Sequence, residues 1–452
     1  MQVSDITFLA IFIATIALVT ALIRASRMPM LLVSLPSVLI WSYATFAYAG
    51  LPLLYFKMDP YRSQHVTDQQ TVLLVLIYAS LAWIGLAIGY LIFVKTVKKI
   101  PVPIQSVADC FSKGQFYYCA FLFALALAAF AFYIAESPQL AIFASLHKNY
   151  EAQAVLRSQM TNALFLNRFN WEQLLYGDVL SFLCFMLFSL ALVRKQALVW
   201  VFWLLTFLLC LAASLVAAQR ALLLQLLVAL FLTGLLTRRQ GRFNLGAVVI
   251  LACVAGLALT GVLTLLANDS QSMLVAVTSL VSRIITGSVT PAYFYVKMFP
   301  DVHAFLHGAS LSNLMGLLPF EQFNLTHEVH VFMAPQYLER GIVGSAPTAF
   351  WGEAYANFGS IGPFFVAVLV GFCVCLLQAL MDRLPASPTT VGLLAWLIVH
   401  VQFLSITSFS NYLFDQHVVV VGLAALGCAL AGGRNRASDS SQTCASWHSS
   451  RA

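Results

Sequence analysis

The chain has 452 residues, of which 61% are hydrophobic and only 9% are charged, with a formal net charge of +7. A soluble domain carries about a quarter charged residues because its surface must be solvated, so this composition excludes one. The apolar runs are solid rather than alternating, which also excludes the strands of a membrane barrel. The sequence therefore predicts an all-α polytopic membrane protein.

In chain order, the apolar runs predict about eleven transmembrane helices, because each approaches the roughly 20 residues that cross the hydrocarbon layer. We expect one membrane domain over residues 1–436 and a disordered, Ser-rich cytoplasmic tail over 437–452. The predicted spans are Ile6–Ile23, Pro29–Ala49, Thr71–Val94, Gln115–Ala135, Leu174–Val193, Ala197–Ala217, Ala221–Leu236, Leu245–Leu266, Gly359–Leu380, Thr390–Ile406 and His417–Ala431.

Basic residues predict the orientation of these spans. If alternate connections share one side, that side collects 15 of the 24 Lys and Arg residues but only three acidic residues, Asp109, Asp382 and Asp439. The positive-inside rule makes this side cytoplasmic, with the N-terminus outside and the C-terminus inside. The net positive charge is thereby a topology signal and predicts no nucleic-acid partner.

Two external loops are longer than connectors need to be, about 136–173 and 268–358. Long loops without obvious disorder usually have a function. Within the second loop, Leu274–Ile285 and Leu311–Leu318 are half apolar, which is typical of re-entrant or interfacial helices. We expect the polar chemistry of the protein in this loop.

Three arginines recur where predicted helix ends meet the outer surface: Arg220 at the tip of a helical hairpin, Arg283 in an amphipathic segment, and Arg340. A guanidinium offers a fixed fork of donors that matches phosphate and stays charged at any relevant pH. These residues could bind a lipid diphosphate together, or could pair with neighbouring acids and extend to headgroups.

The second external loop, about 268–358, holds four of the nine histidines, including His327 and His330. Their spacing differs from HExxH, whose two histidines are four residues apart, so no metal site is predicted. Glu353 and Asn357 share one helical face near the membrane surface, where they serve either packing or a site.

The span count, the large late external loop and Arg220 resemble the Wzy-type O-antigen polymerases, which join oligosaccharide repeat units in bacterial envelopes. The strongest likeness is Gly-Glu-Ala-Tyr-Ala-Asn-Phe-Gly-Ser-Ile-Gly at 352–362, which is similar to the x-E-x-Y-x-x-x-G-x-x-G pattern of that family.

This resemblance implies a GT-C-like fold in the bacterial inner membrane. It also implies a glycosyltransferase that uses undecaprenyl-diphosphate-linked glycans as donor and acceptor at the periplasmic face. Such an enzyme uses no nucleotide sugar, cofactor or metal, and inverts the anomeric centre. A separate protein that sets chain length is a further partner that the resemblance allows.

Carried over to this chain, the resemblance assigns the diphosphate to Arg220 and Arg283, with Arg340 assisting. His330 or His327 would accept the proton of the acceptor hydroxyl, and Glu353 is the rival base. Pre-placed cations would stabilise the charge that develops on the leaving group, and imidazole suits proton transfer at neutral pH.

Three alternatives remain open from the sequence. An O-antigen ligase would share the fold type but transfer the glycan to a lipid A core. A lipid-linked glycan flippase or transporter would need no catalysis. Such proteins commonly carry ionisable groups near the midplane, whereas the spans predicted here carry almost none apart from His400 and Asp178. A membrane scaffold would use the long loop as a protein-binding surface.

Overall fold

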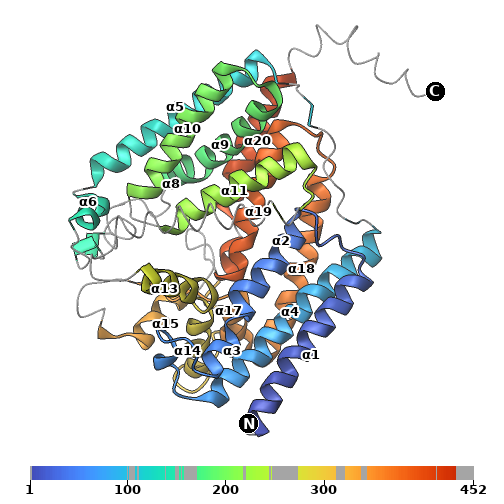
Figure 1. The fold of residues 1–452 in the computed structure, drawn as a ribbon, viewed down its shortest axis with the longest axis vertical. Coiled ribbons are helices and arrows are strands. Elements are labelled where there is room, and N and C mark those ends of the chain that lie inside the picture. The colour runs from blue at the N-terminus through green and yellow to red at the C-terminus, as the bar shows by residue number, and fades with distance from the viewer. Residues whose placement is uncertain are drawn as a thin grey trace.

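A computed structural model gives the fold of this chain (Figure 1). It describes residues 3–98, 100, 107–108, 111–137, 139–147, 152–153, 155–156, 171–216, 220–243, 246, 273–311, 321–336, 344–413 and 415–433. Over these residues the secondary structure is helical, and the only β-type pairing is an isolated bridge between Leu32 and Arg242. The predicted all-α class is thus confirmed for the described part of the chain.

Ten helical segments in the described part are long and apolar enough to cross a membrane, and each coincides with a predicted span. The remaining prediction, Leu245–Leu266, lies almost wholly outside the described residues. The ten segments are Ser4–Ala25, Leu35–Tyr55, Gln69–Val97, Lys113–Glu136, Trp171–Arg194, Ala197–Val216, Leu222–Arg239, Phe350–Met381, Pro388–Ser405 and Ser410–Gly432.

Several segments combine shorter helices. The helices that form or cap the spans are α1 (Val3–Ala25), α2 (Leu35–Tyr43), η1 (Ala44–Tyr48), α3 (Leu51–Tyr55), α4 (Gln69–Val97), α5 (Lys113–Glu136), α8 (Trp171–Gln173), η4 (Leu174–Val179), α9 (Leu180–Arg194), α10 (Ala197–Val216), α11 (Arg220–Arg239), α17 (Phe350–Phe358), η6 (Gly359–Ile361), α18 (Gly362–Met381), α19 (Pro388–Gln402), η7 (Phe403–Ser405), η8 (Ser410–Tyr412) and α20 (Gln416–Gly433).

Side-chain caps define where several of these helices begin. Ser34 and Ser112 form reciprocal capping boxes, and Asp68 and Ser387 accept hydrogen bonds from the first-turn backbone amides of α4 and α19. Each cap satisfies amide groups that no carbonyl of the helix can reach. These caps set the starting points of four spans.

We expect the outward faces of the helices to contact lipid. On α20, the side chains of Val419, Leu423, Leu426 and Leu430 are all exposed and lie along one face. A row of exposed leucines of this kind would be unfavourable in water but is favourable against acyl chains. The ten apolar segments and these faces indicate a multi-pass membrane protein.

The helix ends gather at two opposite sides of the bundle. At one side, residues 31–33 share backbone hydrogen bonds with residues 241–243, and the Ala108 amide bonds the Ala386 carbonyl at 3.1 Å. These contacts join the connections that the sequence assigns to a single side. That side also carries described basic residues at helix ends: Arg24, Arg27, Lys95, Lys98, Arg194, Lys195, Arg238, Arg239, Arg242 and Arg383.

The opposite side carries a layer of short helices from the second long loop, which we call the outer layer: α13 (Met273–Ile285), α14 (Val289–Met298), α15 (Leu325–Met333) and α17. In Figure 1 these helices lie together at the end of the molecule that contains the N-terminus. The predicted amphipathic segment Leu274–Ile285 forms α13, whereas Leu311–Leu318 falls outside the described residues except for Leu311. In the first long loop, the described part includes α6 (Ala141–Leu146).

Glycines hold α4 and α18 in close contact along their length. A Cβ on Gly89 would come 2.2 Å from the Val368 carbonyl oxygen, and one on Gly371 would come 2.5 Å from the Leu86 carbonyl oxygen. Small residues allow this backbone approach, which is the main source of helix association in lipid.

We expect Gly89→Ala to destabilise the protein, because the added methyl group meets backbone that cannot rotate away. The free energy of unfolding should fall by about 1–3 kcal/mol, the usual cost of overpacking. The measurement is the apparent melting temperature of the purified protein in detergent.

Gly422→Ala is the matched control, because a Cβ at Gly422 meets no atom within 4 Å. Helix propensity alone should make this variant neutral or stabilise it by up to about 1 kcal/mol. Equal melting temperatures for the two variants would contradict the close contact.

Candidate functional site

Asp59 connects the loop after α3 to the outer layer. Its carboxylate is buried and accepts hydrogen bonds from the Ser282 hydroxyl at 2.7 Å and the Thr286 hydroxyl at 2.5 Å. The other oxygen accepts the backbone amides of Tyr61 and Arg62. Burial raises the pKa of Asp59, but these hydrogen bonds outweigh burial and hold the pKa below its ordinary value. The carboxylate thus remains ionised and anchors the loop.

Aromatic and hydroxyl contacts reinforce this connection. The Tyr61 hydroxyl lies 3.0 Å from the Thr278 hydroxyl on α13. The Tyr293 hydroxyl, on α14, accepts the Asp68 amide at 3.3 Å. The loop from 56 to 68 is therefore held against both α13 and α14.

This packing brings two arginines from distant parts of the chain together. Arg62 follows the Asp59 turn and is half-buried, whereas Arg283 lies in the last turn of α13 and is exposed. The pKa of Arg62 is lowered by burial and then by the positive charge of Arg283, with a smaller opposite effect from Asp59. Within the described residues, neither guanidinium forms a salt bridge with a carboxylate.

The positive charges of Arg62 and Arg283 act on each other and repel, so a bound anion would stabilise the pair. Guanidinium groups also offer the donor geometry that phosphate oxygens accept. The arrangement of Arg62 and Arg283 is chemically suited to a phosphate or diphosphate group. Arg62 was not anticipated by the sequence analysis.

The two predicted histidines lie together on α15. The Nδ1 atom of His327 is 3.3 Å from the Gly344 carbonyl oxygen, and the His330 ring packs against Gly344, where a Cβ would come within 2.4 Å of it. Burial and then the neighbouring His327 lower the pKa of His330. Since its pKa is low, His330 is neutral at neutral pH, which is the state that can accept a proton. α15 packs on α14 through Phe294 and Phe332.

Glu353, the rival base, is only 2% exposed and is engaged on both oxygens. One oxygen accepts the Ser310 hydroxyl at 2.7 Å, and the other accepts the Ser410 amide at 2.9 Å. Asn357 donates to Ser310 at 2.7 Å and accepts the Gly308 amide at 2.9 Å. This geometry favours a role for Glu353 in positioning the outer layer over the role of base.

Other residues of the 352–362 motif contact backbone groups or shape the backbone themselves. The Tyr355 hydroxyl donates to the Phe299 carbonyl at 2.9 Å. Gly359 has a φ of +66°, which an L side chain rarely adopts, and a Cβ on Gly362 would lie 2.2 Å from the Ala354 carbonyl oxygen. The motif therefore builds the turn between α17 and α18 and anchors the preceding loop.

The other two predicted arginines are less completely described. Arg220 is the first residue of α11, next to α10, as expected for the second helix of a hairpin, but its side chain is outside the described set. Arg340 lies outside the described residues. Among the side chains that the structure describes, no group of three or more His, Cys, Asp or Glu residues is arranged to hold a metal ion.

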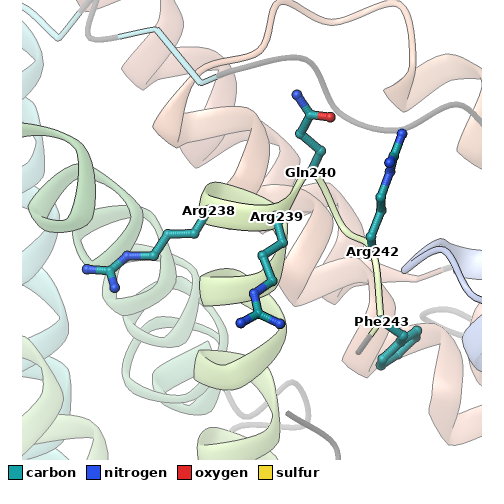
Figure 2. A pocket seen from close by; sticks show the side chains of 5 residues that line it. All are labelled: Arg238, Arg239, Gln240, Arg242 and Phe243. Carbon is teal, nitrogen blue, oxygen red and sulfur yellow. The ribbon is translucent and has the colours of Figure 1, made fainter. Parts of the chain in front are cut away.

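A hollow on the opposite side of the bundle is also basic. Arg238, Arg239, Gln240, Arg242 and Phe243 line it. Figure 2 shows that the three guanidinium groups point in different directions rather than toward one point. This divergence suits contact with several lipid headgroups more than recognition of one ligand.

Comparison of the chain with protein-family models, with curated proteins and with solved structures finds no match. Any function must therefore be argued from the residues themselves.

The anchoring role of Glu353 can be tested by measuring the stability of variants. We expect Glu353→Ala to lower the melting temperature in detergent, because a buried donor left unpaired costs about 1–3 kcal/mol. Glu353→Gln should have a smaller effect, because the amide oxygen can still accept the Ser410 amide. Glu321→Ala, at an exposed position, is the control and should change stability by less than about 0.5 kcal/mol. A Glu353→Ala protein as stable as the wild type would contradict the anchoring role.

Proposed function

We propose that this protein is a membrane glycosyltransferase that polymerises undecaprenyl-diphosphate-linked oligosaccharide repeat units into a surface polysaccharide. The observation that carries the proposal is the pair of guanidinium groups, Arg62 and Arg283, on the outer layer. It is supported by the neutral His330 on α15 of the same outer layer, and by the resemblance of the 352–362 motif to the polymerase family.

The proposed reaction is a single displacement at the anomeric carbon of the donor. The acceptor hydroxyl oxygen forms the new bond to this carbon, its proton passes to His330 or His327, and the bond to the lipid diphosphate breaks. Arg62 and Arg283 stabilise the negative charge that collects on the leaving diphosphate. Attack opposite the leaving group inverts the anomeric centre. Arg220 and Arg340 remain predicted contributors to the same diphosphate site.

The proposed location is the bacterial inner membrane, with the outer layer in the periplasm. The basic side of the bundle then faces the cytoplasm, which accords with the positive-inside rule. We propose a GT-C-like arrangement, in which spans bind the lipid chain and a loop layer performs the chemistry. A ligase that uses the same donor differs only in its acceptor.

A lipid-linked glycan transporter is the second candidate, and one observation favours it. His400, Asp415, His417 and Asp178 form two close pairs at the ends of neighbouring spans. Ionisable groups in such positions are costly in a membrane and are typical of transport pathways.

We expect Arg62→Ala and Arg283→Ala each to shorten the surface-glycan ladder on a denaturing gel. The variants would be expressed in a strain that lacks the chromosomal gene. Removing one pre-placed donor costs roughly 10²–10³-fold in rate, so the ladder should collapse toward core plus one repeat. Arg62→Lys should retain part of the activity, because it keeps the charge but loses the planar fork.

Arg238→Ala, at the opposite side of the bundle, is the control and should leave the ladder intact. Long polymer retained on the carrier lipid in the deletion strain would indicate the ligase instead. An unchanged ladder in the deletion strain would exclude both glycosyltransferases and leave the transporter.

The low pKa of His330 predicts the pH dependence of polymerisation by the purified protein. A protonated imidazole cannot accept a proton, so the rate should fall only below the ordinary histidine value of about 6.5. His327→Gln removes the neighbouring charge and should move this acid limb toward higher pH. His147→Gln, at an exposed position in the first long loop, should leave it in place. An acid limb that is the same after His330→Gln would exclude His330 as the base.

A further inference from the structure

A second polar cluster lies away from the outer-layer histidines, where α19 ends and α20 begins. The Nε2 atom of His400, on α19, is 2.5 Å from the Asp415 carboxylate, and the His400 side chain is only 16% exposed. The second carboxylate oxygen of Asp415 accepts the backbone amides of His417 and Val418, in the first turn of α20. Asp415 is therefore held rigidly while it orients His400.

A second histidine–aspartate pair adjoins the first. The Nδ1 atom of His417 is 2.7 Å from the carboxylate of Asp178, on the π-helical segment η4. The centres of the two imidazole rings are 6.0 Å apart. The two pairs thus connect three spans. The first contains η4 and α9, the second contains α19 and η7, and the third contains η8 and α20.

The groups around the histidines are acidic or phenolic. Glu172, on α8, is buried, and its Oε2 atom has no hydrogen-bond partner among the residues that the structure describes. The Tyr412 hydroxyl donates to the His400 carbonyl at 2.8 Å. The titratable side chains in contact with the two histidines are Asp178 of η4, Tyr412 of η8 and Asp415. Beyond them, Tyr176 of η4 lies close enough to Asp178, Glu172 and Tyr133 for their charges to act on it. The helix α11, which packs along α19, begins at Arg220.

We propose that the His400–Asp415 and His417–Asp178 pairs form a proton-binding site at the outer ends of these spans. Each carboxylate favours a positively charged imidazole beside it. The rings are 6.0 Å apart, so the two pairs form one continuous polar cluster. This site is separate from the glycan chemistry proposed above and does not depend on it.

Proton binding would strengthen the contacts between the spans. Protonation turns each imidazole–carboxylate hydrogen bond into an ion pair, which adds Coulomb attraction between the two partners. Since each pair joins a different span to α20, the outer end of α20 is held more firmly when the site is protonated. The proton is thereby coupled to the packing of α20 against α19 and η4.

Trp396 provides a direct test that needs no substrate. Its ring stacks on the His400 ring, with centres 4.7 Å apart and an interplanar angle of 11°. An imidazolium in this position interacts with the indole as a cation and quenches its fluorescence. We expect the tryptophan fluorescence of the purified protein in lipid nanodiscs to fall in a sigmoidal step between about pH 8 and pH 5.

Two variants should remove this step, His400→Gln and Trp396→Phe. Asp415→Asn should move the midpoint of the step, because the carboxylate beside His400 is lost while asparagine still caps α20. Asp178→Asn should move the midpoint less, since it acts through His417. His65→Gln, at an exposed position in the loop after α3, should reproduce the wild-type curve.

The proposal is overturned if the step is absent from the wild type, or if it persists unchanged in His400→Gln. A His400→Gln variant that unfolds would be recognised by size-exclusion chromatography, and the Asp415→Asn midpoint then decides the matter. A ladder assay that excludes polymerisation would leave this result unaffected.

Discussion

The buried carboxylate of Glu353 is the interaction on which the outer layer depends. It holds together three segments that are remote in sequence: the loop near Ser310, the helix α17 and the turn at Ser410. A carboxylate in so dry a position is tolerated only when donors surround it, because an unpaired buried charge is very costly. Its donors come from both sides of α17, so α17 can pack only when both neighbouring segments are in place. The family-like motif around it is thus largely a set of structural contacts.

The chemistry that we propose is carried by loops that the spans position. Asp59 fixes the loop after α3 against α13, and this contact places Arg62 beside Arg283. The spans contribute little polarity of their own except at α19 and α20. In the proposed function, loop residues would bind the lipid diphosphate and the spans would hold those loops in place.

The sequence predicts the spans well because crossing a membrane requires a long apolar helix, whatever its neighbours are. The amphipathic α13 was predicted for a similar reason, because its alternation of apolar and polar residues is contained within the helix itself. The pairing of Arg62 with Arg283 could not be predicted, because no local pattern relates a turn after one span to a helix in a late loop. The role of Glu353 could not be predicted either. What makes it an anchor rather than a base is that Ser310 and Ser410 donate hydrogen bonds to it, and these residues lie 43 and 57 positions away in the sequence. His400 stood out in the sequence as an ionisable group within a predicted span, but its partner Asp415 became apparent only from the fold.

The turn at Gly359 has a consequence for the membrane itself. The apolar segment from Phe350 to Met381 contains 32 residues, and a continuous helix of that length would extend about 48 Å. That length exceeds the roughly 30 Å of a hydrocarbon layer, so the helix would have to tilt strongly or thicken the bilayer. With the turn, only the 20 residues of α18 need to cross, and they extend about 30 Å. The turn at Gly359 thus matches α18 to the hydrophobic thickness of the membrane and leaves α17 free to pack, buried, among the outer-layer helices.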